Sequence, residues 1–200
     1  MSRIFISHSS ANNAAALALA NWLEANGWGE YFLDFDANQG IRTGERWIAA
    51  LKSAADRCEA VLCLVSTEWL KSDMCRAEFN LASFRDKRIF GVLVEKIPNS
   101  QLPDQMTSVW QLCDLAHSDN PVTFTVEKLP TVPRALVHFP HMGLEALKIG
   151  LKNAGLDAST FEWPPESQPD RSPYPGLLAF DEPDSAIFFG REVFIVRAIN

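Results

Sequence analysis

The distribution of proline divides the chain into two halves of different character. The first 97 residues contain no proline, whereas all 12 prolines fall between Pro98 and Pro183. Proline removes a backbone hydrogen-bond donor and interrupts helices and central strands. The first half can therefore form regular elements without interruption, and the second half is expected to be more irregular.

Short apolar runs alternate with segments of helical periodicity in the first half. Strands are predicted at the apolar runs, over residues 3–8, 31–34, 60–66 and 89–95. Helices are predicted between them, over residues 12–26, 44–56 and 72–84. Apolar runs without alternation are typical of strands that are covered on both faces. The pattern predicts an α/β fold, with a parallel sheet flanked by helices on both faces and functional residues outside the carboxyl ends of its strands.

The second half predicts smaller elements and then a linker. A fifth strand is expected over 110–116, a hairpin from 122–126 and 135–139, and a helix over 142–154 that Gly155 ends. Residues 157–184 contain six prolines, seven acidic residues and one basic residue. This proline-rich, acidic composition predicts a partly extended linker.

Charge, cysteine content and hydropathy exclude several classes of protein. Residues 1–156 carry 17 acidic and 15 basic residues, so we expect no binding of nucleic acid. The four cysteines form no Cys-x-x-Cys pair, which predicts reduced thiols and no metal site. The longest apolar runs are far shorter than the ~20 residues of a membrane helix, and the N-terminus lacks the pattern of a signal peptide. We therefore expect a cytoplasmic protein that does not bind a membrane.

Three motifs in the first half, in this order, resemble those of the Toll/interleukin-1 receptor (TIR) domain family. Residues 4–9 (Ile-Phe-Ile-Ser-His-Ser) resemble its first strand, and residues 32–47 resemble its second strand and BB loop. Residues 61–66 followed by 69–78 resemble its third strand and its Ser-x-Trp-Cys-x-x-Glu helix. The resemblance implies a flavodoxin-like TIR domain over 1–156. It weakens after Val94, and residues 118–141 look like an insertion.

The C-terminal segment resembles a different family. Residues 173–192 look like the entry segment of bacterial STAND NTPase modules. We therefore expect a linker over 157–172 and the start of a STAND module over 173–200, which makes the chain a part of a longer protein. A phosphate-binding Gly-x-x-x-x-Gly-Lys-Ser/Thr motif does not occur in the chain, so no ATP binding is expected of it.

Glu78 is the residue that the resemblance marks as catalytic, because TIR-type NAD⁺ hydrolases use a glutamate at this position. Cleavage of the nicotinamide–ribose bond builds positive charge on the ribose, which a nearby carboxylate stabilises. NAD⁺ would be the substrate, and no cofactor is implied. On composition alone, Glu78 would instead be a solvated helix glutamate.

The resemblance also implies a set of substrate-binding residues around Glu78. These are His8, Ser9, Asp34, Phe35, Asp36, Ile41, Arg46 and Met74. A lone histidine is more often structural, so a structural role stays open for His8, and for Arg46 a solvated surface position is favoured over contact with phosphate. Met74 lies one helical turn before Glu78, where the family usually has tryptophan, and a role as core filler stays open for it.

Two functions follow from the resemblance. The first is an NAD⁺ nucleosidase that is activated by TIR–TIR self-association, as in prokaryotic antiphage immunity, where loss of NAD⁺ stops growth of the infected cell. The loop after Asp34 would make a head-to-tail contact that does not close and can build filaments. The second is a non-catalytic adaptor, which Met74 favours. An action on nucleic acid is disfavoured by the near-neutral domain.

Overall fold

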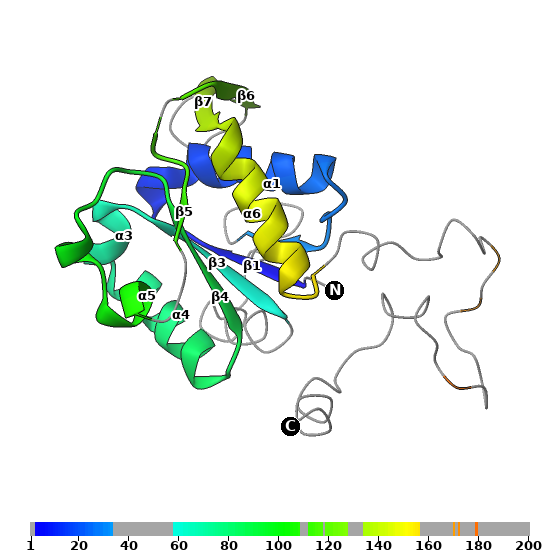
Figure 1. Cartoon of the computed structure of the whole chain (residues 1–200), viewed down its shortest axis with the longest axis horizontal. Coiled ribbons are helices and arrows are strands. Elements are labelled where there is room, and N and C mark those ends of the chain that lie inside the picture. Colours follow the sequence, from blue (N-terminus) through cyan, green and yellow to red (C-terminus); the bar gives the residue numbers. More distant parts are fainter. Residues whose placement is uncertain are drawn as a thin grey trace, which may run out of the picture.

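The computed structural model describes residues 3–33, 58–108, 112–117, 119–127 and 134–156, and three isolated residues beyond them. The loop predicted after Asp34, the helix 44–56, the linker 157–172 and the STAND segment 173–200 lie outside these ranges, isolated residues apart. Within the described residues, five strands form one sheet in the order β2-β1-β3-β4-β5 (Figure 1). This is the strand order of flavodoxin-like α/β folds, and it confirms the predicted fold class.

Every neighbouring pair of strands in this sheet is parallel. The strands are β1 (Ile4–Ser7), β2 (Tyr31–Phe32), β3 (Ala60–Val65), β4 (Arg88–Leu93) and β5 (Cys113–Asp114). The first four were predicted close to these bounds. The fifth is two residues long, much shorter than the predicted 110–116, and it pairs with β4 only at Val92 and Leu93.

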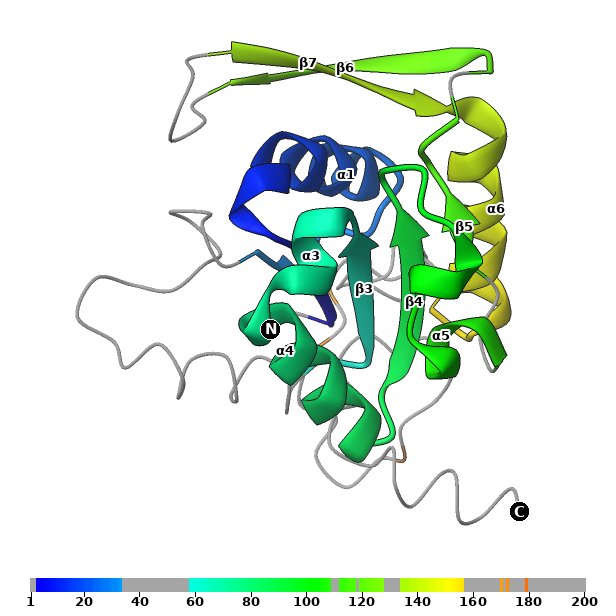
Figure 2. The same cartoon turned by 90° about the vertical axis from the view of Figure 1, so that its left-hand side faces the viewer.

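Helices connect the strands and cover both faces of the sheet. They are α1 (Asn13–Ala25), α3 (Thr67–Lys71), α4 (Asp73–Phe84), α5 (Asp104–Ser108) and α6 (His141–Asn153), with 3₁₀ turns η1 (Ser10–Asn12) and η2 (Asn99–Gln101). Figures 1 and 2 show α1 and α6 on one face and α3, α4 and α5 on the other. The helices predicted over 12–26, 72–84 and 142–154 are confirmed, whereas α3 and α5 were not predicted.

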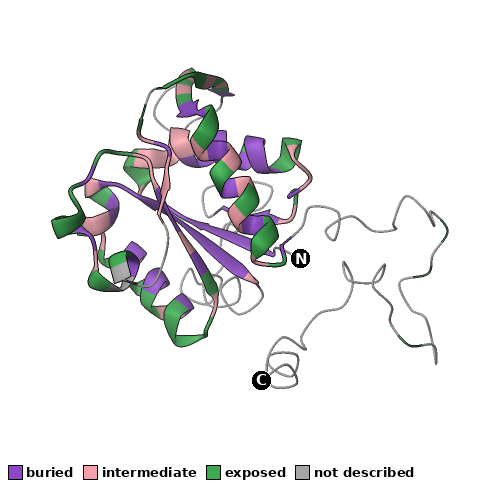
Figure 3. Cartoon of the chain, in the orientation of Figure 1, coloured by how far each residue is buried: buried purple, intermediate pink, exposed green. Residues whose placement is uncertain are grey.

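Two apolar cores form because successive side chains of a strand point to opposite faces of the sheet. In β3, Leu62 and Leu64 belong to the core beneath α1 and α6. Their neighbours Val61 and Val65 belong to the core beneath α3 and α4, together with Trp69. Every residue of β3 is buried (Figure 3), as its continuous apolar sequence predicts.

A separate antiparallel ribbon lies over α1, on the side away from the sheet (Figure 2). It consists of β6 (Pro121–Glu127) and β7 (Arg134–Pro140), and it confirms the predicted hairpin. Its Val126 and Phe139 are buried in the same core as α1. Because α1 is packed between the sheet and the ribbon, its sequence is apolar on more than one side.

Two glycines follow the ends of helices, as the sequence predicts for Gly155. Gly27 follows α1 with φ 91° and Gly155 follows α6 with φ 74°, a left-handed conformation that other residues rarely adopt. The residues after them are joined, because Trp28 Nε1 donates a hydrogen bond to the Leu156 carbonyl at 2.8 Å. None of the helices in the described ranges is both long and apolar enough to cross a membrane.

Candidate functional site

The sheet reverses its strand order at the carboxyl ends of β1 and β3. The chain leaves β1 through α1 on one face towards β2, and it leaves β3 through α3 and α4 on the opposite face towards β4. Connections that diverge in this way open a crevice outside the strand ends, where α/β folds bind their ligands. Here the two strand ends are Ser7-His8 after β1 and Ser66-Thr67 after β3. They lie on the same edge of the sheet because the two strands are parallel, with Ser7 paired with Cys63.

A buried carboxylate lies at these strand ends. Glu78 is on α4, and the residue is only 8% exposed. The Ser7 hydroxyl at the end of β1 donates a hydrogen bond to Glu78 Oε2 at 2.6 Å. Ser7 Oγ in turn accepts a hydrogen bond from Trp69 Nε1 on α3 at 3.1 Å. The expectation of a solvated surface glutamate is therefore wrong, because the structure buries the carboxylate and gives it a specific donor.

Two thiols lie on the core side of this carboxylate. Burial raises the pKa of the Cys63 thiol well above its usual value, and the nearby charge of Glu78 raises it further. Cys75, one turn before Glu78 on α4, donates from Sγ to the His8 carbonyl at 3.4 Å. Neither cysteine forms a disulfide bond. The site therefore places a carboxylate next to two buried cysteines.

His8 and Ser9 lie at the end of β1, where the sequence predicts them, and each makes a local hydrogen bond. His8 is buried, and its Nε2 donates to Asn13 Oδ1 at 3.1 Å. Ser9 is half-buried and caps η1, accepting from the Ala11 N–H at 3.4 Å. Ser66 Oγ reaches across from β3 to Asn12 Oδ1 at 2.6 Å. The contact between Ser66 and Asn12 holds the segments that follow β1 and β3 together.

Met74 is half-buried and packs against the core beneath α3 and α4. It does not enter the hydrogen-bonded pair of Ser7 and Glu78. The indole that reaches this pair comes from Trp69, five residues earlier in the chain. Its ring packs edge-on against Phe79 with centroids 6.2 Å apart.

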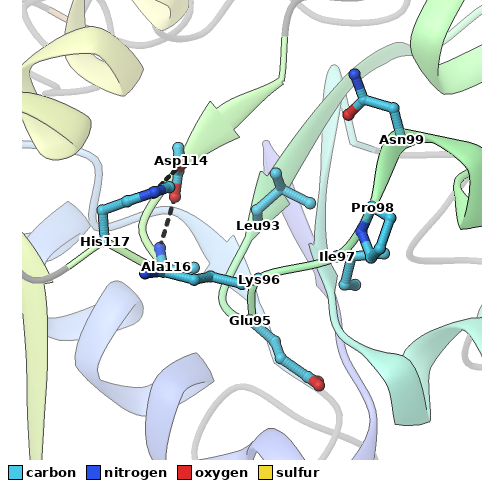
Figure 4. A pocket seen from close by; sticks show the side chains of 9 residues that line it. All are labelled: Leu93, Glu95, Lys96, Ile97, Pro98, Asn99, Asp114, Ala116 and His117. Carbon is cyan, nitrogen blue, oxygen red and sulfur yellow. Dashed lines mark hydrogen bonds and ion pairs between the residues drawn. The ribbon is translucent and has the colours of Figure 1, made fainter.

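A pocket of about 390 Å³ opens at the carboxyl ends of β4 and β5, on the same edge of the sheet (Figure 4). None of the predicted site residues lines it. On its wall, the Asp114 carboxylate contacts His117 Nδ1 and accepts from the Ala116 N–H at 2.8 Å. Glu95 also lines the pocket, and it accepts hydrogen bonds from the N–H and hydroxyl of Thr67, the residue that starts α3, at 2.9 and 2.8 Å. The Thr67 backbone N–H lowers the pKa of Glu95, and the Thr67 hydroxyl adds to this effect.

The structure thus brings Glu78, His8 and Ser9 to one edge of the sheet. The predicted loop residues Asp34, Phe35, Asp36, Ile41 and Arg46 lie outside the described residues. Among the residues that the structure describes, no three potential metal ligands gather. Ser7 and Trp69 were not predicted as site residues. The available signal was a serine closing the first strand, directly before the predicted His8.

Comparison with known proteins supports the family that the motifs indicate. A model of the TIR domain family matches residues 4–129, well over half of the chain. No curated protein matches the sequence. Among solved structures, the TIR domain of the Toll-related receptor TRR-2 from Hydra magnipapillata is similar, with 14% identity and a TM-score of 0.49, and the alignment covers 57% of this chain and 84% of that one. On the strength of the family match, the chain belongs to the TIR domain family.

Proposed function

We propose that this TIR domain is an NAD⁺ nucleosidase, with Glu78 as its catalytic carboxylate. The observation that carries the proposal is the placement of Glu78: it is buried, it accepts a 2.6 Å hydrogen bond from Ser7, and it lies where the strand order reverses. The proposal extends beyond family membership, because TIR domains include both NAD⁺ hydrolases and adaptors without activity.

The proposed reaction needs one well-placed negative charge. The bond between ribose C1′ and the nicotinamide nitrogen breaks, and its electron pair leaves with nicotinamide. Positive charge then develops on the ribose ring, and the Glu78 carboxylate stabilises it there. Water or a second nucleophile of the same molecule captures C1′ and loses a proton, which gives linear or cyclic ADP-ribose. Because nicotinamide leaves as a neutral molecule, no strong general acid is required.

The remaining predicted residues would bind NAD⁺ around this carboxylate. His8 and Ser9 would line the crevice from β1, and Met74 would line it from α4. Asp34, Phe35, Asp36, Ile41 and Arg46 would approach from the loop that follows β2. We propose that the same loop contacts a neighbouring TIR domain, so that self-association switches the enzyme on.

We further propose that the domain spans residues 1–156 and is joined by the linker 157–172 to a STAND module that starts near 173. In this arrangement a triggered NTPase would bring TIR domains together in the cytoplasm. Depletion of NAD⁺ by the assembled enzyme would serve antiphage defence of the abortive-infection type. This context rests on the resemblance of residues 173–192 to STAND modules.

A non-catalytic adaptor is the second candidate, and one observation favours it. Met74 stands where the family usually has tryptophan, and it is half-buried and packs against the core. An adaptor would use TIR–TIR contacts and would have no NAD⁺ turnover to lose.

The two candidates are separated by NAD⁺ consumption at high protein concentration with a crowding agent, with assembly followed by light scattering. Glu78→Ala and Glu78→Gln run in parallel, and Gln retains the shape of the side chain without its charge. We expect turnover in the native chain and a loss of at least about 100-fold in both variants. Turnover that survives in both variants contradicts the role of Glu78. Assembly without any turnover in the native chain contradicts the enzyme and supports the adaptor.

A further inference from the structure

The hydrogen bonds around Ser7 have a direction that the donor chemistry dictates. An indole N–H donates and never accepts, so Ser7 Oγ must be the acceptor in its 3.1 Å contact with Trp69 Nε1. A hydroxyl has a single hydrogen. With Trp69 on one side of the oxygen, the Ser7 hydrogen points to the 2.6 Å contact with Glu78 Oε2. The chain of donors therefore runs from Trp69 through Ser7 to Glu78.

We propose that Trp69 is a positioning residue for Glu78, which orients the Ser7 hydroxyl so that its hydrogen stays on the carboxylate. The inference rests on the proposed function, since it specifies how this site prepares its catalytic group. A donor that is held on a carboxylate favours the ionised form and fixes the orientation of its plane. Both effects serve the stabilisation of positive charge on the ribose.

The surroundings of Trp69 fix the indole strongly enough for this role. Its side chain is 1% exposed, and its ring packs edge-on against Phe79, the residue after Glu78. Its backbone N–H donates to Ser66 Oγ, the cap of α3, at 3.0 Å. Both ends of the residue are thus held, and hydrogen bonds in a dry environment are stronger than in water.

A second buried tryptophan provides a matched control on the opposite face of the sheet. Trp28 is fully buried and also makes one indole hydrogen bond, to the Leu156 carbonyl at 2.8 Å. Trp28→Phe and Trp69→Phe each shorten a buried ring and remove one indole donor. The two variants should lose similar stability in thermal melts, so a difference in catalysis between them reports the contact with Ser7.

The first test compares the kinetics of the two variants. Trp69→Phe should lower kcat roughly tenfold with little change in KM, and Trp28→Phe should stay within about twofold of the native chain. The acid limb of the kcat profile should move to higher pH in Trp69→Phe, because the carboxylate has lost support for its ionised form. Equal kcat and equal pH profiles in the two variants would overturn the proposal.

A double-mutant cycle tests whether Trp69 acts through Ser7. If it does, Trp69→Phe combined with Ser7→Ala should be no slower than Ser7→Ala alone, because the hydroxyl that Trp69 orients is already absent. If the two substitutions instead lower kcat by factors that multiply, Trp69 affects the site by packing alone, and the proposal fails.

An NMR measurement tests the inference without NAD⁺ turnover. The indole N–H signal of Trp69, assigned from its loss in Trp69→Phe, should shift as Glu78 titrates, and the shift should disappear in Glu78→Gln and in Ser7→Ala. If the pH-dependent shift of this signal is the same in both variants as in the native chain, the proposal is overturned. If the signal responds as expected in a chain without NAD⁺ turnover, the proposed enzyme fails while the positioning of Glu78 by Trp69 stands.

Discussion

The two faces of the sheet use the same strands for different purposes. Beneath α1 and α6, the buried side chains of the core are apolar and include Trp28, whose indole joins two chain segments. Beneath α3 and α4, the core includes Trp69, whose indole bonds to the polar pair of Ser7 and Glu78. Both faces therefore pack an apolar core, and one of them also encloses a carboxylate.

The difference shows what burial of a carboxylate requires. An isolated buried charge is very costly, and it is tolerated when hydrogen bonds satisfy it. Ser7 supplies such a bond. Throughout the described residues, no buried side-chain nitrogen or oxygen lacks a hydrogen-bond partner. The hydrogen bonds thus offset the cost of burying this carboxylate. Removal of one partner would leave a buried polar group unsatisfied and should lower the free energy of unfolding.

The largest stability effect should come from the apolar face. Leu147 on α6 is 1% exposed, and Leu147→Ala should reduce the free energy of unfolding by about 2–5 kcal/mol through lost contacts and a cavity. NAD⁺ turnover per folded molecule should stay unchanged, since α6 carries no predicted site residue. Urea titration and the crowded NAD⁺ assay measure the two quantities. Loss of turnover in fully folded Leu147→Ala would contradict the separation between the face beneath α6 and the face that holds the candidate site.

A smaller effect is expected where α6 meets β5. A Cβ added to Gly143 would lie 2.3 Å from the Asp114 carbonyl oxygen and 2.8 Å from Leu115 Cδ2. The backbone atom cannot rotate away, so Gly143→Ala should destabilise the fold by about 1–3 kcal/mol.

Gly150 in the same helix is the matched control. A Cβ there meets only Phe90, at an ordinary 3.5 Å, so Gly150→Ala should stabilise the fold by about 0.5–1 kcal/mol. Thermal melts compare the two variants. Equal shifts of Tm would show that α6 does not pack on β5 as closely as described.

The smallest effect is expected at Glu95 and depends on pH. The pKa of Glu95 is lowered in the folded state, so its contribution to stability is present above the unfolded-state pKa and is lost as pH falls through the folded-state pKa. At neutral pH, Glu95→Gln should cost about 0.5 kcal/mol or less, since the group is exposed. Urea titrations at pH 7 and pH 3 should show a difference from the native chain that disappears in acid. A constant difference would assign the effect to packing.

The sequence predicts those elements whose signal is local. β3 and β4 follow from continuous apolar runs, and α4 begins where Ser72 can cap it, as its hydroxyl does by accepting from the Cys75 N–H. The five-residue helices α3 and α5 are too short to show a helical period. The strand β5 is only two residues long because only these two residues pair with β4.

The candidate site divides in the same way. Glu78 could be predicted, because it belongs to a motif within one helix. Its partners could not, since Ser7 lies 71 residues from Glu78 and 62 residues from Trp69. These three residues meet only after β1 and β3 pair in register and α3 folds over their ends. A one-residue slip of that register would turn Ser7 to the opposite face.

The ribbon over α1 also determines when the domain can finish folding during synthesis. About 110 residues separate the end of α1 from the start of β7, and synthesis at roughly 5–20 residues per second needs on the order of ten seconds to make them. Throughout this interval, the outer side of α1 emerges from the ribosome without the strands that cover it. Such delayed long-range contacts leave apolar surface open to aggregation. The nascent chain should therefore need a chaperone most in the interval between the synthesis of α1 and that of β7, when the outer side of α1 is uncovered.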